Sequence, residues 1–395
     1  MLQFKKRFMI SIAIMLFAFL FPAMQSVDAH PYSASYTTLQ LTKSYTKMTY
    51  ALDELSVIEL TKGDLNQNGM LEQEEFDAVR DQFIETLKEN ITLRMNGEEK
   101  SWTSVESVTL DRKGSDTQII LSVIYPPVSE SQSVSLKDDL YVGDSKTNYA
   151  NLLTIHYGEQ TSTAAISGNH RAWAMQLTDE DYAGLKQDDQ TQPKVESKQT
   201  NEVEKTASDT EKTTSGWLSF FTLGMNHILE GFDHLLFLFS LLIARQTFKQ
   251  YAAVITSFTI AHSLTLTLTV LGWIDLSPKI VEPLIALSIC YVAIDNLIRK
   301  NVSYRWILTF VFGLVHGMGF ADILKEMNIP KSEQAVNLAS FNIGIETVQL
   351  GIVIFLLPLL GILHRWKYSR RVIFIGSILT FVLGAIWFVE RVLYA

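Results

Sequence analysis

The chain has 395 residues, 47% of them hydrophobic, and a formal net charge of −9. This acidic excess argues against nucleic acid as a partner, because binding to phosphates requires an excess of Lys and Arg. Cys290 is the one cysteine in the sequence, which excludes an intramolecular disulfide and a thiolate-rich metal site.

Residues 1–29 predict a cleavable signal peptide. The basic group Lys5-Lys6-Arg7 precedes an apolar run, and Val27-Asp28-Ala29 then offers small residues for cleavage. An uncleaved extra membrane span is the alternative, although the apolar run is short for one. Cleavage after Ala29 would make His30 the first residue of the exported protein.

Residues 30–182 predict an exported, mainly β domain. Alternation of apolar and polar residues, rich in β-branched side chains, recurs at 36–41, 91–95, 118–125 and 152–157. This pattern is typical of half-buried strands, and we expect a sandwich-like arrangement of them. Residues 183–216 have few large apolar side chains and many polar ones, so they predict a disordered linker.

One motif in the exported domain has the spacing of a calcium-binding loop. Residues 64–75 match the EF-hand loop pattern, and the expected ligands are the main-chain carbonyl of Met70 and the side chains of Asp64, Asn66, Asn68, Glu72 and Glu75. A helix is expected from Phe76 onward, whereas residues 55–60 fit a helix or a strand. Two neutral Asn ligands predict weak affinity, with a Kd of ~10⁻⁴–10⁻³ M. The alternative is an acidic Asn-Gly turn that binds no ion.

Residues 217–395 predict an all-α membrane domain, a bundle of six helices. Apolar runs long enough to cross ~30 Å of hydrocarbon recur at 218–244, 250–273, 279–298, 304–324, 335–362 and 371–393. Lys and Arg are denser in the joints after the first, third and fifth runs, which places those joints in the cytoplasm. We therefore expect a multi-pass protein of the plasma membrane, with the N-terminal domain and the C-terminus on the extracytoplasmic side.

Histidines and carboxylates recur at membrane depth in this domain. Ionisable groups are costly there and mark ion paths or catalytic sites. The candidate metal ligands are His227, Asp233, His234, His262, His316 and Glu346, with Glu230, Ser263, Asp322 and Asn342 in support. Histidine and carboxylate without thiolate suit nickel, cobalt, copper(II), iron or zinc. The alternative for each residue is a hydrogen bond between helices.

The spacing of the first two histidines raises a geometric question. His227 and His234 are roughly 10 Å apart along a helix axis, so an unbroken helix cannot present both to one ion. Either the helix breaks at Gly231, or the two histidines are separate positions along a conduction path.

Four separated motifs resemble those of a known membrane family. His227-x-x-x-Gly231-x-Asp233-His234 resembles the signature of the HupE/UreJ proteins; the other motifs, which resemble the broader family, are Ala261-His262-Ser263, His316-Gly-x-Gly-Phe-Ala321 and Phe341-Asn-x-Gly-x-Glu346. The resemblance covers residues 216–395 and implies permeation of nickel or a related divalent cation, with the histidines and the aspartate of the first helix needed for it. Ile228 stands where the nickel-permease signature has a proline.

These features predict a permease for a divalent transition metal whose partners are the lipid bilayer and the ion; a homo-oligomer is left open. The first alternative is an intramembrane zinc-dependent hydrolase acting on a lipid or an acyl link, with Glu346 or Asp233 as the base, because three histidines can hold zinc with one open position. In a second alternative the membrane part only anchors the exported domain. The exported domain would then capture a metal ion or a partner. Independently of these alternatives, the mature His30 could chelate copper through its amine and imidazole, with His156 or His170 nearby. Whether the protein is an enzyme is not decided by the sequence.

Overall fold

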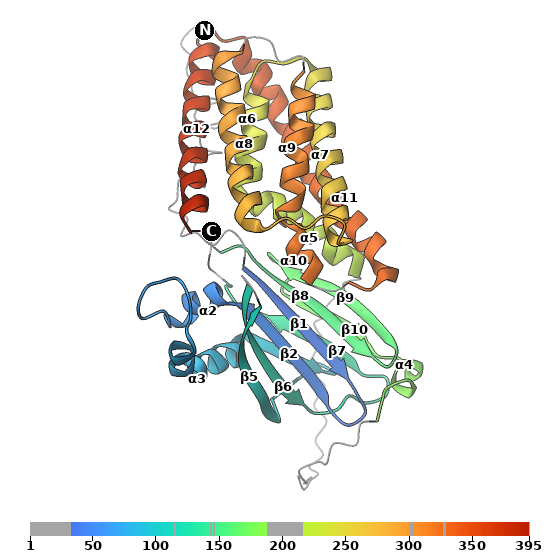
Figure 1. Ribbon diagram of the computed structural model, residues 1–395. Helices are drawn as coiled ribbons and strands as arrows, with labels where there is room; N and C mark the ends of the chain where they lie inside the picture. Colours follow the sequence, from blue (N-terminus) through green and yellow to red (C-terminus); the bar gives the residue numbers. More distant parts are fainter. Residues whose placement is uncertain are drawn as a thin grey trace, which may run out of the picture. The chain divides into compact units, whose positions relative to one another are not determined.

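The computed structural model describes residues 33–113, 116–142, 144, 147–187, 216–299, 304–326 and 329–394 (Figure 1). The predicted signal peptide, His30 and most of the predicted linker lie outside these residues. The chain divides into two compact units. The first is rich in strands and lies mainly within 33–219, and the second is helical and extends from Phe220 toward the C-terminus.

Ten strands in the described part of the first unit form two sheets. The strands are β1 (Ser33–Leu41), β2 (Thr46–Asp53), β3 (Ile91–Met95), β4 (Glu98–Lys100), β5 (Ser104–Lys113), β6 (Asp116–Tyr125), β7 (Ser133–Asp138), β8 (Tyr149–Tyr157), β9 (Gln160–Ser167) and β10 (Ala172–Gln176). The larger sheet has the order β5-β6-β2-β1-β8-β9 and the smaller one β10-β7-β3-β4. Within the larger sheet β1 is antiparallel to β2 and parallel to β8. The four predicted strands are confirmed as β1, β3, β6 and β8.

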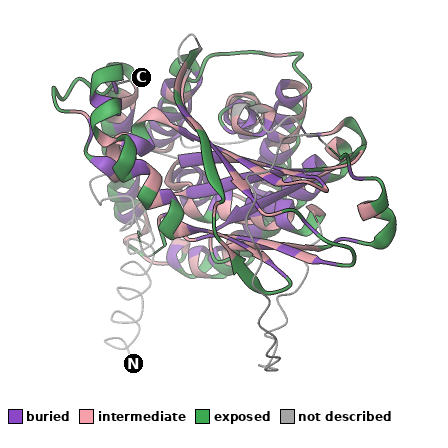
Figure 2. Ribbon diagram, turned by 90° about the horizontal axis from the view of Figure 1, so that it is seen from below, coloured by how far each residue is buried: buried purple, intermediate pink, exposed green. Residues whose placement is uncertain are grey.

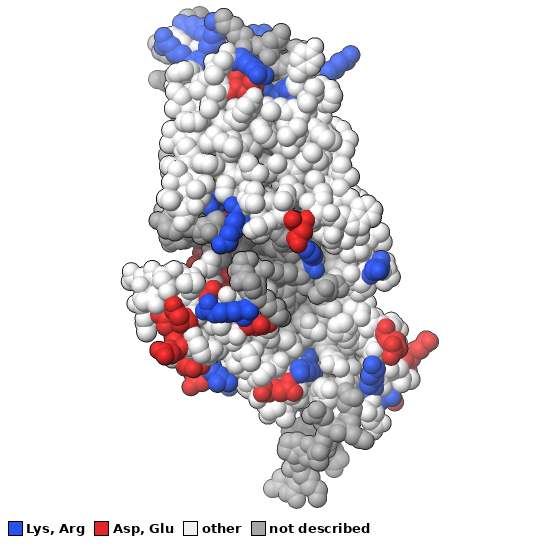
Figure 3. All heavy atoms as spheres, in the orientation of Figure 1, with Lys and Arg blue, Asp and Glu red and all other residues white. Residues whose placement is uncertain are grey.

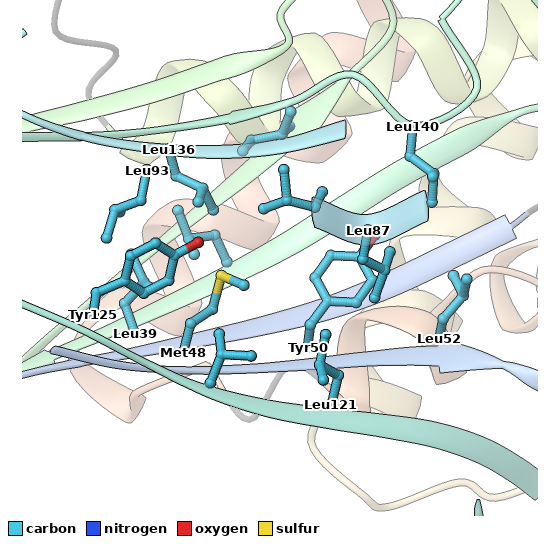
Figure 4. Packing of buried hydrophobic residues seen from close by; sticks show 14 of the residues in the cluster. Leu39, Met48, Tyr50, Leu52, Leu87, Leu93, Leu121, Tyr125, Leu136 and Leu140 are labelled. Atoms are coloured by element: carbon cyan, nitrogen blue, oxygen red, sulfur yellow. The ribbon is translucent and has the colours of Figure 1, made fainter. Parts of the chain in front are cut away.

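The two sheets share one hydrophobic core, which is the arrangement expected of a sandwich. Leu39, Met48 and Tyr50 reach it from the larger sheet, and Leu93 and Leu136 from the smaller (Figure 4). Figure 2 shows buried residues along the strands and exposed ones at the turns. The alternating burial of β3 and β7 follows from their period-2 sequences.

The described part of this unit also contains the helices α2 (Glu54–Thr61), α3 (Gln73–Asn90) and α4 (Asp179–Ala183). The segment that fitted helix or strand is the helix α2. Asp53 caps it by accepting a hydrogen bond from the main-chain N–H of Ser56, and Lys62 ends it in the left-handed conformation. The predicted exiting helix is confirmed as α3, and its residues Phe76 and Phe83 are buried in the core of the sandwich.

The second unit contains α5 (Gly216–Glu230), α6 (Phe232–Ile243), α7 (Phe248–Val270), α8 (Pro278–Ile298), α9 (Arg305–Met318), α10 (Ala321–Glu326), α11 (Lys331–His364) and α12 (Ser369–Tyr394). Among the described residues, α7, α8, α11 and α12 are each long and apolar enough to cross a membrane, and α5 with α6 makes a fifth candidate bent by 66°. The predicted run 304–324 instead forms α9, with 14 residues, and the short α10. At ~1.5 Å per residue α9 alone is shorter than the hydrocarbon layer. The multi-pass architecture is therefore supported, with four or five spans by this measure.

Small residues allow the helices of this unit to approach closely. A methyl group on Gly313 of α9 would lie 2.6 Å from the carbonyl oxygen of Phe258 in α7, and one on Gly317 would overlap the carbonyl oxygen of His262. Gly224 of α5 and Gly344 of α11 contact each other's helix backbone in the same way. Such contacts are typical of helix packing in lipid, and here they bring the backbones of α7 and α9 together beside His262.

The outer surface of the helical unit suits a lipid environment. Large apolar side chains are exposed on its long helices, among them Leu264, Leu287, Ile354 and Val389. Figure 3 shows a face of this unit that is nearly free of charged side chains over its middle, with Lys, Arg, Asp and Glu gathered toward its ends. An apolar band bounded by charged ends is expected where helices cross a bilayer.

Candidate metal centre

A break between α5 and α6 brings the first two histidines together. Gly231 separates the two helices, with φ −75° and ψ 91°, and the chain bends there by 66°. A Cβ atom at Gly231 would lie 2.6 Å from the carbonyl oxygen of His227 and 3.0 Å from Nδ1 of His234, so the bend leaves room for glycine alone. As a result the ring centroids of His227 and His234 are 4.6 Å apart. Of the two sequence-based alternatives, the structure therefore has the broken helix.

His262 completes a group of three histidines. It comes from α7, and its ring centroid lies 6.2 Å from that of His227 and 6.0 Å from that of His234. One ring nitrogen from each of the three lies within 4.8 Å of the other two, and all three side chains are buried. Among all the histidine, cysteine, aspartate and glutamate side chains that the structure describes, these three histidines are the set whose ligand atoms lie close enough together to hold one metal ion.

Four ring nitrogens of this group lack protein partners. Nε2 of His227, Nε2 of His234 and both ring nitrogens of His262 are buried without a hydrogen bond. A buried polar atom without a partner costs about 1–3 kcal/mol, so several of them in one place are hard to explain by packing alone. A divalent ion would satisfy them together, and imidazole suits zinc, copper, iron and nickel. The three histidines therefore fit a transition-metal ion.

Asp233 acts on this group through His234. Its Oδ1 accepts a hydrogen bond from the main-chain N–H of His234 at 2.8 Å and lies 3.0 Å from Nδ1 of the same residue. An ionised carboxylate only accepts, so Nδ1 carries the proton and Nε2 keeps its lone pair. Asp233 was expected as a ligand; the structure pairs its carboxylate with His234, where it orients the imidazole and raises its basicity.

His316 of α9 lies beside the group rather than within it. Its ring centroid is 5.3 Å from that of His234, and the two rings meet edge to face. The side chain is fully buried between Phe237 and Phe258. Nε2 of His316 lies 2.9 Å from Oγ of Ser288 in α8, whereas Nδ1 is buried without a partner. Ser288 was not predicted as a site residue, since a serine within an apolar helix carries no periodic signal.

The structure does not bring Glu346 to the histidines. Gly344 turns one face of α11 toward α5, and Glu346 follows about 200° further around the helix, where its side chain is exposed. Asn342 shares that side of the helix; its amide donates to the carbonyl of Leu338. Asn342 and Glu346, four residues apart, thus share one face of α11, and this is not the face that packs against α5.

Three supporting residues have less defined roles. Glu230 is the half-buried last residue of α5, and Ser263 is half-buried directly after His262. The side chain of Asp322 lies outside the described part of the structure.

Two aromatic residues border the site without having been predicted as ligands or supports. The ring of Phe320 is 4.3 Å from that of His227 and stacks on Phe341 at 5.1 Å, which shields the site from water.

The predicted calcium loop lies between α2 and α3. Oδ1 and Oδ2 of Asp64 accept hydrogen bonds from the main-chain N–H groups of Asn68 and Gly69, at 3.2 and 2.8 Å. Oε1 of Glu75, at the other end of the loop, accepts from the N–H of Leu65 at 3.0 Å. Gly69 has a φ of +78°, which favours glycine at the turn. The amides of the two predicted Asn ligands both donate to the carboxylate of Glu72.

The helical unit thus belongs to the class of multi-pass membrane domains that bury a histidine cluster between their helices. Residues 202–391 match the family model described as HupE / UreJ protein, so the C-terminal domain is a member of the HupE/UreJ family, and the resemblance stated from its motifs is confirmed. This family is associated with nickel and cobalt transport. No curated protein matches the sequence significantly.

Proposed function

We propose that the membrane domain is a permease for a divalent transition metal of the nickel and cobalt class. The observation that carries this proposal is the convergence of His227, His234 and His262, each of which has at least one buried nitrogen without a protein partner. Three neutral imidazoles bind an ion without fully compensating its charge. Such a site holds the ion in the membrane and still releases it, as conduction requires.

The positive charge of the ion in this site is balanced by a carboxylate that is not itself a ligand. Asp233 is the carboxylate nearest to the three histidines by its hydrogen bond to His234. A divalent cation buried in an apolar surrounding is costly unless a negative group is close. Asp233 supplies that charge without occupying a ligand position, so the ion remains exchangeable.

The proposal includes six spans and a defined orientation. The helices α9 and α10 follow each other within residues 305–326, a stretch as long as the roughly 20 residues that one crossing of the bilayer needs, and we assign the sixth crossing to the two together. The distribution of Lys and Arg in the joints supports a plasma-membrane protein with its N-terminal domain and C-terminus on the extracytoplasmic side.

Metal analysis of purified protein, together with uptake of ⁶³Ni²⁺ or ⁵⁷Co²⁺ by cells that produce it, tests the function. His262→Ala removes one of the three ligands, and we expect it to abolish uptake and to lower the bound metal at least 10-fold. His364→Ala is the matched control, because His364 also lies in the membrane unit but contacts the carbonyl of Ile243. Uptake that is equal in wild type and His262→Ala would refute the proposal. Tightly retained zinc without uptake would instead favour the intramembrane hydrolase.

The loop of residues 64–75 supports a second, independent proposal, a calcium site in the exported domain. The loop joins two helices, its glycine has the required positive φ, and the carboxylates of Asp64, Glu72 and Glu75 accept hydrogen bonds from within the loop. Carboxylate oxygen atoms that hydrogen bonds hold within one loop are the ligands that calcium prefers. Because two of the predicted ligands are neutral, we propose a weak site that stabilises the domain at extracellular calcium concentrations.

A further inference from the structure

The hydroxyl group of Ser288 decides where the proton of His316 lies. Oγ of Ser288 is 2.6 Å from the carbonyl oxygen of Ile285 and 2.9 Å from Nε2 of His316. A carbonyl oxygen only accepts, so the single hydroxyl hydrogen is used on Ile285. The hydroxyl oxygen must then accept the second hydrogen bond, and Nε2 of His316 donates it.

A neutral imidazole carries one proton, so this contact leaves Nδ1 of His316 with a free lone pair. Nδ1 is buried and has no partner. A lone pair without a donor, next to three histidines that each have an unpartnered nitrogen, is what a further ligand to a cation would present. The neighbouring His234 has the opposite tautomer, because Asp233 accepts from its Nδ1. Two rings only 5.3 Å apart are thus set in opposite tautomers by two different side chains.

We propose that Ser288 is a positioning residue for metal binding, which holds His316 in the tautomer that offers Nδ1 to the ion. His316 then takes the ion next to the centre of His227, His234 and His262. For the identity of the ion, this inference rests on the proposed function. A hydroxyl raises the basicity of an imidazole less than a carboxylate does, so His316 binds more weakly than His234. An ion that moves from the three-histidine centre to His316 therefore meets a weaker position, from which it can leave.

The first test needs no metal. Nitrogen-15 NMR of metal-free, histidine-labelled full-length protein separates protonated from unprotonated ring nitrogens, and comparison with His316→Gln assigns the signals of His316. We expect the proton on Nε2 and a bare Nδ1. In Ser288→Ala this preference is lost, and Ser288→Thr, which keeps a hydroxyl, retains it. A proton on Nδ1 of His316 in the wild type would overturn the inference, even if both Ser288 variants failed to fold.

The second test measures Co²⁺ affinity and the visible absorption of the bound ion. Ser288→Ala should weaken the second, weaker step of Co²⁺ binding, the one assigned to His316, about 10–100-fold and change its spectrum, with recovery in Ser288→Thr. Ser377→Ala is the matched control, because Ser377 is an equally buried serine in α12; it should leave both readouts unchanged. Equal affinity and spectrum in wild type and Ser288→Ala would refute the role of Ser288 while leaving the permease intact. Absence of Co²⁺, Ni²⁺ and Zn²⁺ binding in the wild type would refute the proposed function and, with it, His316 as a ligand.

Discussion

At the residue scale, Gly231 has the most direct influence on the centre. A side chain there would collide with the carbonyl of His227 and with His234. The smallest structural change that removes this collision is a change in the bend that brings these two histidines together. We expect Gly231→Ala to lower Co²⁺ affinity at least 10-fold, a loss of about 1.4 kcal/mol in binding free energy. Titration followed by absorption measures it.

Gly351→Ala is the control for this substitution. Gly351 lies in a membrane helix, α11, and nothing stands within 4 Å of the position that its Cβ would take. An unchanged affinity in Gly231→Ala would mean that the histidine pair does not depend on the break.

Asp138 in the exported domain provides a prediction about pH. Its side chain is completely buried, and it accepts hydrogen bonds from Tyr149 and Asn151, both at 2.6 Å. Burial raises the pKa of Asp138 above its usual value, although these hydrogen bonds and Arg171 work in the opposite direction. At pH values between the pKa of Asp138 in the unfolded chain and its higher pKa in the folded domain, the folded domain therefore binds more protons than the unfolded chain. Its stability must fall as pH rises through that interval.

The substitution Asp138→Asn removes this titration. We expect the free energy of unfolding of Asp138→Asn, relative to wild type, to increase from about pH 4 upward. Urea unfolding of residues 30–187 over a pH series measures the difference. A difference that stays constant with pH, or that decreases, would show that hydrogen bonding outweighs burial at Asp138.

Individual residues of the centre were predictable to different degrees. The histidines could be found because an ionisable residue within an apolar run stands out in any sequence. Ser288 could not, since serine is common in membrane helices and its role depends on the tautomer of a residue 28 positions away. Glu346 was expected near the histidines because it is a carboxylate at membrane depth, but only the packing of Gly344 against α5 reveals which face of α11 it lies on.

At the scale of elements, local patterns predicted the strands and most helix positions well. Alternation identified β1, β3, β6 and β8, because each places one face on the core of the sandwich. The short segment before the calcium loop was ambiguous, since eight residues of α2 are too few for a helical period to stand out. The end of the fourth predicted span was missed for another reason. Apolar composition continues past Met318, whereas the helix stops there.

The loop between α2 and α3 gives a prediction that concerns both helices. With a Kd of ~10⁻⁴–10⁻³ M, calcium at 10 mM should stabilise the exported domain by about 1.4–2.7 kcal/mol. Glu75→Gln removes the carboxylate expected to bind the ion with both oxygens, so it should abolish the effect. Thermal unfolding with calcium and with EDTA measures it.

Glu74→Gln is the matched control for the loop, because Glu74 is exposed and stands one position before Glu75 outside the ligand pattern. It should keep the response to calcium. An equal response of the wild type to magnesium and calcium, or no response to either, would contradict a calcium site.

At the scale of the whole molecule, the orientation in the membrane can be tested with single cysteines in a Cys290→Ala background. Trp273, between α7 and α8, is 77% exposed, and Tyr304, between α8 and α9, is 78% exposed. A membrane-impermeant maleimide should label Trp273→Cys on intact cells and Tyr304→Cys only after permeabilisation. Because the two positions are similarly exposed, accessibility within the protein does not account for a difference in labelling between them.

A third cysteine, in Lys331→Cys, tests the number of spans. Lys331 is the exposed first residue of α11, so labelling on intact cells means that α9 and α10 together cross the bilayer. Labelling only after permeabilisation would leave five spans.

The break at Gly231 also has an electrostatic consequence. A helix carries about half a positive charge at its N-terminus and half a negative charge at its C-terminus. The carbonyl end of α5 terminates next to His227, and the amide end of α6 begins next to Asp233, which lies in its first turn. The interrupted helix thus places a partial negative charge beside the three imidazoles and a partial positive charge beside the carboxylate. The two helix dipoles therefore favour a cation among the imidazoles and a negative charge on Asp233. This contribution matters most where little water is present to stabilise the charges.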